Sequence, residues 1–358
     1  MHRLDRALVA VLLSCAAFQL QAQPVGPDTL PKRYPWDQRL PRCFMAPSGY
    51  TPMGCAEPVH WPSHGEARQR VDNLLTMQDY DLLQRAEQEL GFSRERFSDG
   101  QYRFDAWLAS LEPFFDAWGA RGKAMAESWA SAKGRDGYAT LALALAAYGE
   151  GWSVRGGGTA NTVTPEAWTI FHRKLEEADA ILEGASPKLK AMGPWYVLKM
   201  RIAFQHPKLR ESAPELVKKA SAAWPEYLRM YTVPMTYVGP LWRGSFEQMD
   251  EVARLAMQRN GEKAAMYAFV YERHLRMTRG GSYTLRNMAA DWDLMKRGFR
   301  EVESGPNGPQ WMAANFALLA CQMRDREETR RLYRLADGNN PAAAAQGTDP
   351  CRVFAMSE

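Results

Sequence analysis

Residues 164–182, TPEAWTIFHRKLEEADAIL, decide the fold class of this chain. The segment opens with a threonine followed by a proline, which is the usual order of an N-cap and a first helical residue. Apolar side chains then recur every three or four positions, and they are Trp168, Phe171, Leu175, Ala178 and Leu182. This spacing places them on one face of an α-helix. We therefore predict a helix here with one buried face.

The same periodicity recurs along most of the chain. Residues 139–148, ATLALALAAY, are apolar almost all round, and so short a run predicts a buried helix rather than a membrane span. Ser245 and Gln248 have the spacing of a capping box that opens a helix to Gln258. Apolar stripes predict further helices near residues 71–75, 82–90, 104–115, 194–204, 213–231, 262–277 and 288–302. We expect an all-α protein, built as an array of antiparallel helical hairpins with a Pro-rich N-terminal arm.

The last predicted hairpin, residues 309–341, resembles one tetratricopeptide repeat. Phe316, Ala317, Ala320, Tyr333, Ala336 and Pro341 stand at the packing offsets of such a repeat, and Asp325 stands at its turn. Thr329 departs from the pattern, because a small alanine is expected there. The resemblance implies a tetratricopeptide-like α-solenoid.

The N-terminus predicts export. Arg3 and Arg6 precede an apolar run at residues 7–18, and Ala22 offers a small residue for cleavage. We expect a periplasmic or secreted protein cleaved near Ala22, with lipidation at Cys15 left open. The expected order is a signal peptide (1–22), a Pro-rich arm (23–64), an N-terminal helical lobe (65–240), a C-terminal helical-hairpin lobe (241–340) and a tail (341–358).

Four cysteines remain after the predicted cleavage, and they are Cys43, Cys55, Cys321 and Cys351. An even number in an exported chain indicates two disulfides, for which three pairings are possible. The local choice pairs Cys43 with Cys55 and Cys321 with Cys351. No Cys-x-x-Cys occurs, and Pro62 between His60 and His64 prevents a helical metal pair. We predict no metal and no cofactor.

Charge argues against a nucleic-acid partner. The chain has 45 basic and 41 acidic residues among 358, for a formal net charge of +4. A nucleic-acid binder usually has a larger basic excess or a basic stripe. After cleavage of the signal peptide, we also expect no membrane span.

Two tryptophan–arginine clusters are the candidate ligand-binding residues. The first is WSVRG at residues 152–156, which contains Trp152, Arg155 and Gly156. The second is PLWRGS at residues 240–245, which contains Trp242 and Arg243 and follows Tyr237. Each has a plain structural interpretation, as a tight inter-helix turn or as a core aromatic beside a helix cap. If both line one groove, the two arginines suit an anionic ligand.

The W-x-x-R-G and P-x-W-x-G-S patterns also resemble a bacterial helical-domain family of unknown function, over roughly residues 79–260. The resemblance implies helical architecture and brings no activity. Because no catalytic motif occurs, we predict no catalytic residues and expect a non-enzymatic binding or scaffold protein for a peptide, a protein or a cell-wall fragment. The alternative is a cell-envelope hydrolase acting on glycan or peptide, which would need a carboxylate beside these clusters.

Overall fold

The computed structural model describes residues 63–97, 100–116, 120–278, 283–304, 310–337 and 350–356. Within these ranges every regular element is a helix, and the one β-type contact is an isolated antiparallel bridge between Arg96 and Tyr102. The predicted all-α class is therefore confirmed. The predicted signal peptide, most of the predicted arm, and both Cys43 and Cys55 lie outside the described residues.

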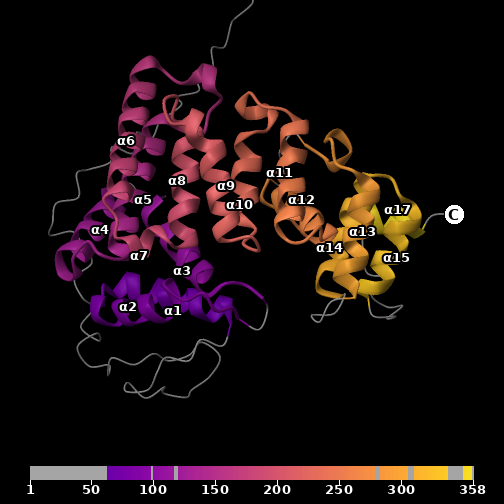
Figure 1. The fold of residues 1–358 in the computed structure, drawn as a ribbon, viewed down its shortest axis with the longest axis horizontal. Coiled ribbons are helices and arrows are strands. Elements are labelled where there is room, and N and C mark those ends of the chain that lie inside the picture. The colour runs from indigo at the N-terminus through magenta and orange to yellow at the C-terminus, as the bar shows by residue number, and fades with distance from the viewer. Residues whose placement is uncertain are drawn as a thin grey trace, which may run out of the picture. The chain divides into compact units, whose positions relative to one another are not determined.

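The helices follow one another along the chain with short connections (Figure 1). Their bounds are α1 His64–Met77, α2 Tyr80–Ala86, α3 Arg103–Leu111, α4 Ala120–Lys133, α5 Tyr138–Arg155, α6 Pro165–Glu183, α7 Pro187–Lys190, α8 Gly193–Gln205, α9 Ala213–Ala223, α10 Arg229–Tyr237, α11 Phe246–Arg259, α12 Ala264–Met277, α13 Trp292–Glu303, α14 Gln310–Gln322, α15 Arg326–Ala336 and α17 Pro350–Met356. Short π-helical turns are η3 Glu87–Gly91 and η4 Glu112–Asp116; short 3₁₀ turns are η5 Ala160–Thr162, η6 Arg210–Ser212, η7 Pro240–Trp242 and η8 Leu285–Asn287. The largest interfaces join successive helices, such as α5 with α6, α12 with α13, and α14 with α15.

The helix starts predicted from capping residues are confirmed. The Thr164 hydroxyl accepts a hydrogen bond from the Ala167 N–H at 3.2 Å, and Pro165 is the first residue of α6. At the start of α11, the Ser245 hydroxyl accepts from the Gln248 N–H at 3.2 Å. The Gln248 side chain accepts in return from the Ser245 N–H at 3.1 Å, which completes the capping box.

The expectation of one continuous helix through residues 213–231 is wrong. Helix α9 ends at Ala223, and α10 begins only at Arg229. The break falls at Trp224, whose φ of −136° and ψ of 63° are not helical, because the ring of Pro225 disfavours the helical region for the residue before it. Both α9 and α10 pack on α8.

The apolar stripe at residues 104–115 also contains two elements. Helix α3 ends at Leu111 and continues as the π-helical turn η4. Pro113 lies inside this turn and has no N–H to donate, so the backbone cannot keep a regular α-helical ladder there. The widened turn carries Glu112 and Asp116, which accept hydrogen bonds from Arg201 of α8 at 3.2 and 2.7 Å.

A largely buried ion-pair network joins α3, η4, α8 and α10. Arg229 donates to both carboxylate oxygens of Glu112, one of them at 2.9 Å. Burial opposes ionisation of Glu112, but Arg229 and Arg201 together hold its pKa below the ordinary value. The network fixes the position of α8, whose C-terminal end contributes to the site described below.

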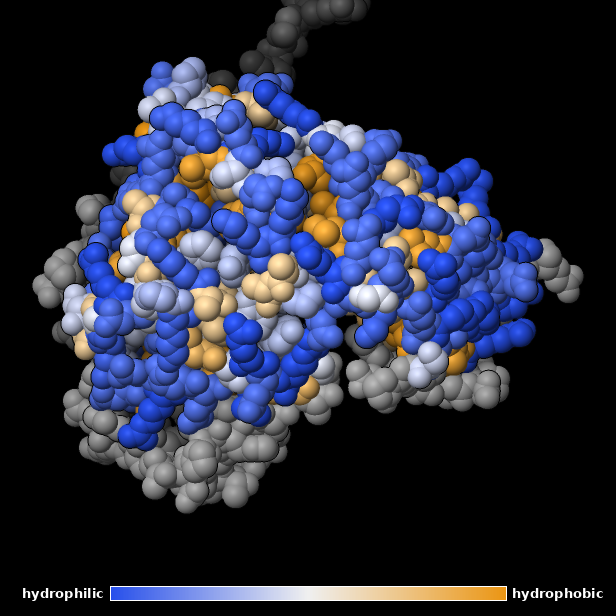
Figure 2. Space-filling model, in the orientation of Figure 1, coloured by the Kyte–Doolittle hydropathy of each residue, from blue (hydrophilic) through white to orange (hydrophobic). Residues whose placement is uncertain are grey.

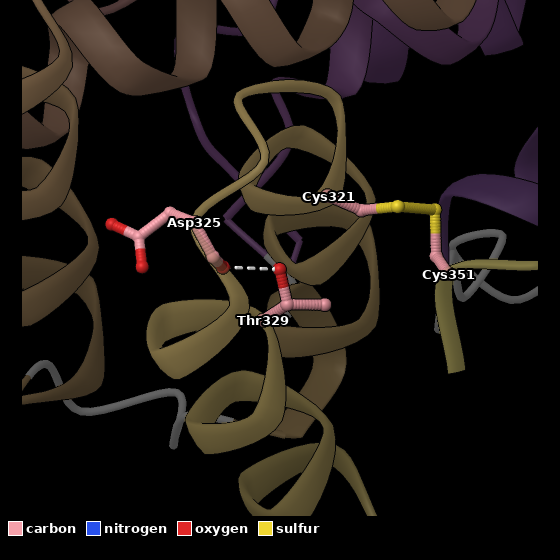
Figure 3. Close-up of a disulfide and its surroundings, with 4 residues drawn as sticks. All are labelled: Cys321, Asp325, Thr329 and Cys351. Atoms are coloured by element: carbon pink, nitrogen blue, oxygen red, sulfur yellow. Dashed lines mark hydrogen bonds between the residues drawn. A yellow bond between two sulfur atoms is a disulfide. The ribbon is translucent and has the colours of Figure 1, made fainter. Parts of the chain in front are cut away.

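The C-terminal helices are joined by a disulfide between Cys321 of α14 and Cys351 of α17 (Figure 3). Asp325 caps α15 by accepting from the Glu328 N–H at 3.0 Å. Thr329, which replaces the expected alanine, is fully buried, and its hydroxyl donates to the Asp325 carbonyl at 2.6 Å (Figure 3). Because its hydroxyl is satisfied locally, a polar residue is tolerated in this close-packed position.

The face shown in Figure 2 is mainly hydrophilic, with apolar residues visible in recesses between the helices. No helix in the described ranges combines the length and apolar character that crossing a bilayer requires. A single apolar cluster runs through the described helices and contains large buried aromatics such as Trp107, Trp129 and Phe171.

Candidate functional site

A pocket of about 660 Å³ brings the two tryptophan–arginine clusters together. Trp152, Arg155, Trp242 and Arg243 all line it. Its walls come from the end of α5 and the turn after it, the first half of α6, the end of α8, and η7. We call this cavity the motif pocket. Helices α5, α6 and α8 are neighbours in Figure 1.

The W-x-x-R-G cluster forms one wall through the end of α5. Gly156 terminates the helix with φ 72°, a conformation that side chains with a Cβ rarely adopt. The Arg155 guanidinium then folds back over the turn and donates from Nη1 to the carbonyls of Gly156 and Gly158 at 2.8 and 2.9 Å. The guanidinium also lies 4.8 Å from the ring centre of Trp152 and 5.0 Å from that of Trp168. Arg155 thus fixes the turn and fills the space between two indoles.

The P-x-W-x-G-S cluster forms the opposite wall. Gly239 to Ser245 is a tight loop, in which the Ser245 N–H donates to the Val238 carbonyl at 2.9 Å. A Cβ on Gly244 would lie 1.8 Å from that same carbonyl oxygen, so only glycine fits there. Arg243 has φ 66° and is exposed at the pocket, and its guanidinium has no hydrogen-bond or ion-pair partner among the described residues.

The two clusters touch through their tryptophans. The rings of Trp152 and Trp242 meet edge to face, with centres 6.5 Å apart. Tyr237 packs behind Trp242, with ring centres 4.9 Å apart, and is itself buried. Tyr237 and Gly156 are not among the described lining residues and support the walls from behind. The other four predicted site residues line the cavity.

The pocket also contains buried polar groups without hydrogen-bond partners. Gln205, only 7% exposed, donates from Nε2 to the hydroxyls of Tyr148 and Tyr237 at 2.7 and 2.6 Å, while its Oε1 has no partner in the described part of the chain. His206 is only 2% exposed, and its Nδ1 likewise has none. The buried indole N–H of Trp152 is a third such group. A buried polar atom that lacks a partner is costly, and a bound ligand can supply one.

Two histidines lie together on this side of the molecule. The rings of His172 and His206 are 5.5 Å apart, and His206 Nε2 lies 3.2 Å from the Glu176 carboxylate. Burial and the neighbouring His206 lower the pKa of His172. Among the residues that the structure describes, no group of three or more His, Cys, Asp or Glu side chains could hold a metal ion.

Arg210 is a residue of the site that the sequence did not single out. It follows α8 and donates to the carbonyls of Phe204, Tyr237 and Trp242 at 3.2, 3.3 and 3.0 Å. These bonds tie η7 to the end of α8. Arg210, Gln205 and His206 carry no motif, so only the fold reveals them. Trp168, expected as a core residue, is half-buried and lines the pocket.

The lining has a positive charge. Arg155, Arg210 and Arg243 line the pocket, and none of the described lining residues is Asp or Glu. Since Arg155 already occupies the faces of two indoles, a cationic ligand would be repelled from the aromatic wall. The pocket suits an anionic or neutral ligand with one flat apolar face.

Comparison of the chain with protein-family models, with curated proteins and with solved structures found no match.

Proposed function

We propose that the chain is an exported, non-enzymatic binding protein whose motif pocket holds an acidic sugar fragment of the cell wall. The observation that carries this proposal is the convergence of two sequence-distant clusters on one cavity with three arginines and no carboxylate. Its volume of about 660 Å³ lies in the range of small-molecule sites.

Each part of the pocket matches one part of such a ligand. The half-buried ring of Trp242 offers flat apolar surface for the face of a pyranose, whereas Arg155 already lies over the rings of Trp152 and Trp168. Gln205 and the Trp152 indole offer one acceptor and one donor for ring hydroxyl and amide groups. The free guanidinium of Arg243 offers a partner for a carboxylate. A peptide or protein ligand would have to present the same acidic group.

The alternative, a cell-envelope hydrolase, would need a carboxylate with a raised pKa in this pocket. The carboxylate of Glu176, which pairs with the lining residue His206, is half exposed and also pairs with Lys208. No Asp or Glu belongs to the described lining. We therefore favour binding over hydrolysis.

The proposal extends to architecture. We propose that the successive helix pairs stack as a tetratricopeptide-like solenoid, as residues 309–341 suggest, because the largest interfaces join neighbours in sequence. We also propose that the chain shares its helical plan with the bacterial family that has the W-x-x-R-G and P-x-W-x-G-S patterns. Export and cleavage near Ala22 belong to the same proposal.

The test compares two sugars that differ by one acidic group. N-acetylmuramic acid is N-acetylglucosamine with an added lactyl carboxylate, so isothermal titration of both isolates the charge. We expect the acid to bind about tenfold tighter or more, because a charge-assisted bond adds about 1.5–3 kcal/mol. Arg243→Ala should remove this preference, and Trp242→Ala should weaken both sugars.

The matched control is Arg286→Ala, which removes another exposed arginine that is not among the described lining residues of the pocket. It should bind as the parent does. Equal affinity for the two sugars, no binding of either, or an Arg243→Ala variant that keeps the preference would each contradict the proposal.

A further inference from the structure

A second cavity, of about 840 Å³, lies along α12, and none of its described lining residues lines the motif pocket. It is lined by α12 and the residues before it, by Arg96, Gly100 and Gln101, by Glu226 and Leu228, and by Met312 of α14. We call it the Arg273 pocket. Nothing in the proposed function uses it.

Arg273 is the feature of this cavity that requires an explanation. The side chain is half-buried, and it forms no ion pair or hydrogen bond with any residue that the structure describes. Burial and the nearby Arg276 lower the pKa of Arg273, although the more distant charges of Asp105 and Glu272 oppose the shift. Two arginines one turn apart on the same helix repel each other. A half-buried arginine without a directly bonded counter-charge among the described residues costs stability, and an anion bound in the cavity supplies that partner.

The other charges of the cavity do not neutralise Arg273. Arg96 pairs with Glu226, and Arg276 pairs with Glu272 at 3.1 Å. Glu226 and Glu272 are the two carboxylates of the described lining, so each of them already has a guanidinium partner. Lys263, at the entrance of α12, adds a further exposed cation. The lining keeps an excess of two positive charges when its four cations are set against its two carboxylates.

Most of the remaining lining is apolar. It is made by Leu228, Ala265, Met266, Phe269 and Met312, beside the uncharged polar residues Gln101 and Asn260. Methionine side chains adapt to irregular apolar shapes, so they suit a flexible hydrocarbon. The cavity therefore places a guanidinium without a directly bonded carboxylate in the same space as five apolar side chains.

We propose that the Arg273 pocket binds a small amphipathic carboxylate, a medium-chain fatty acid, with its head group on Arg273 and its chain against the apolar wall. The planar guanidinium matches a carboxylate in bidentate geometry. The proposal is independent of the motif pocket and of its ligand.

Isothermal titration with decanoate tests it on the full mature chain. We expect one decanoate per chain, and decanol, which has the same tail without charge, should bind at least about tenfold more weakly. Inorganic phosphate alone should also bind at least about tenfold more weakly, because it has no tail to bury. Arg273→Met should lower the decanoate affinity about tenfold or more, whereas Arg286→Met should leave it unchanged.

The stability of Arg273→Met gives a second readout. Without ligand, its melting temperature should equal or exceed that of the parent, because the substitution removes an unpaired half-buried charge. Should Arg273→Met fail to fold, the comparison of decanoate with decanol on the parent decides alone. Equal affinities for decanoate and decanol, undetectable decanoate binding, or full affinity in a folded Arg273→Met variant would overturn the proposal.

Discussion

At the scale of single residues, Glu87 has the clearest pH signature. It is buried in η3 and accepts a hydrogen bond from the Tyr138 N–H at 3.2 Å. Burial raises the pKa of Glu87 to about 7, although that hydrogen bond and Lys188 oppose the rise. The folded chain therefore holds this proton more tightly than the unfolded chain, so the contribution of Glu87 to stability decreases as pH rises from about 4.5 to about 7.

We predict that Glu87→Gln removes this penalty. The difference in unfolding free energy between variant and parent should grow across that pH window, by up to about 3 kcal/mol. Urea denaturation at several pH values measures it. The test compares variant with parent because His274 also titrates in this range. Burial lowers the pKa of His274 to about 4, so both chains lose stability as pH falls towards it. Taking the difference in unfolding free energy removes this shared loss and leaves the effect of Glu87. Glu211→Gln, at an exposed site, is the matched control substitution.

Glu112 provides the opposite case, a largely buried carboxylate with two cationic partners. Glu112→Gln removes the closest carboxylate of Arg229, which keeps only Asp105 at 4.0 Å, and leaves Arg201 with Asp116 alone. We predict a loss of about 3 kcal/mol in unfolding free energy, as expected for breaking a buried pair from one side. A loss below about 0.5 kcal/mol in chemical denaturation at neutral pH would show that the network is solvated and weak.

At the scale of elements, α11 depends on its capping box. Ser245→Ala removes the acceptor for the Gln248 N–H and should lower the unfolding free energy by about 1 kcal/mol. The Ser245 N–H, which closes the P-x-W-x-G-S loop on the Val238 carbonyl, is kept in the variant, so ligand binding in the motif pocket should be unchanged. Thermal melts and titration on the same sample measure both, and Ser304→Ala, at an exposed helix end, is the control.

Most of the helices could be predicted from the sequence. Periodicity and capping residues were sufficient for them, because apolar spacing and N-cap chemistry act locally. They missed the break at Trp224, since the apolar stripe continues past Pro225 while the backbone cannot. They also missed the π-helical turn at Pro113.

The site was predictable only in part, for a physical reason. Tryptophan, arginine and glycine clusters are conspicuous in a sequence, and four of the six predicted residues line one pocket. Gln205, His206 and Arg210 stand out only by what the fold places around them, namely buried atoms without partners and carbonyls from three separate elements. The free Arg273 is hidden in the sequence for the same reason.

At the scale of the whole molecule, the Cys321–Cys351 disulfide links α14 to α17 across 30 residues. We predict that Cys321→Ser with Cys351→Ser lowers the unfolding free energy by about 2–4 kcal/mol. A reducing agent should destabilise the parent similarly and leave this double variant unaffected. If the proposed export is correct, non-reducing mass spectrometry of the chain should also show the predicted Cys43–Cys55 bridge, and four free thiols would contradict an oxidising compartment.

Everything proposed for function depends on the W-x-x-R-G and P-x-W-x-G-S segments meeting at one pocket. A double-mutant cycle with Trp152→Ala and Trp242→Ala, followed by urea denaturation, directly measures the coupling free energy between the two segments. The edge-to-face contact at 6.5 Å predicts a coupling free energy of about 0.5–1.5 kcal/mol. Strictly additive effects, with a coupling below about 0.3 kcal/mol, would mean that the two tryptophans do not touch and that the motif pocket does not exist in solution.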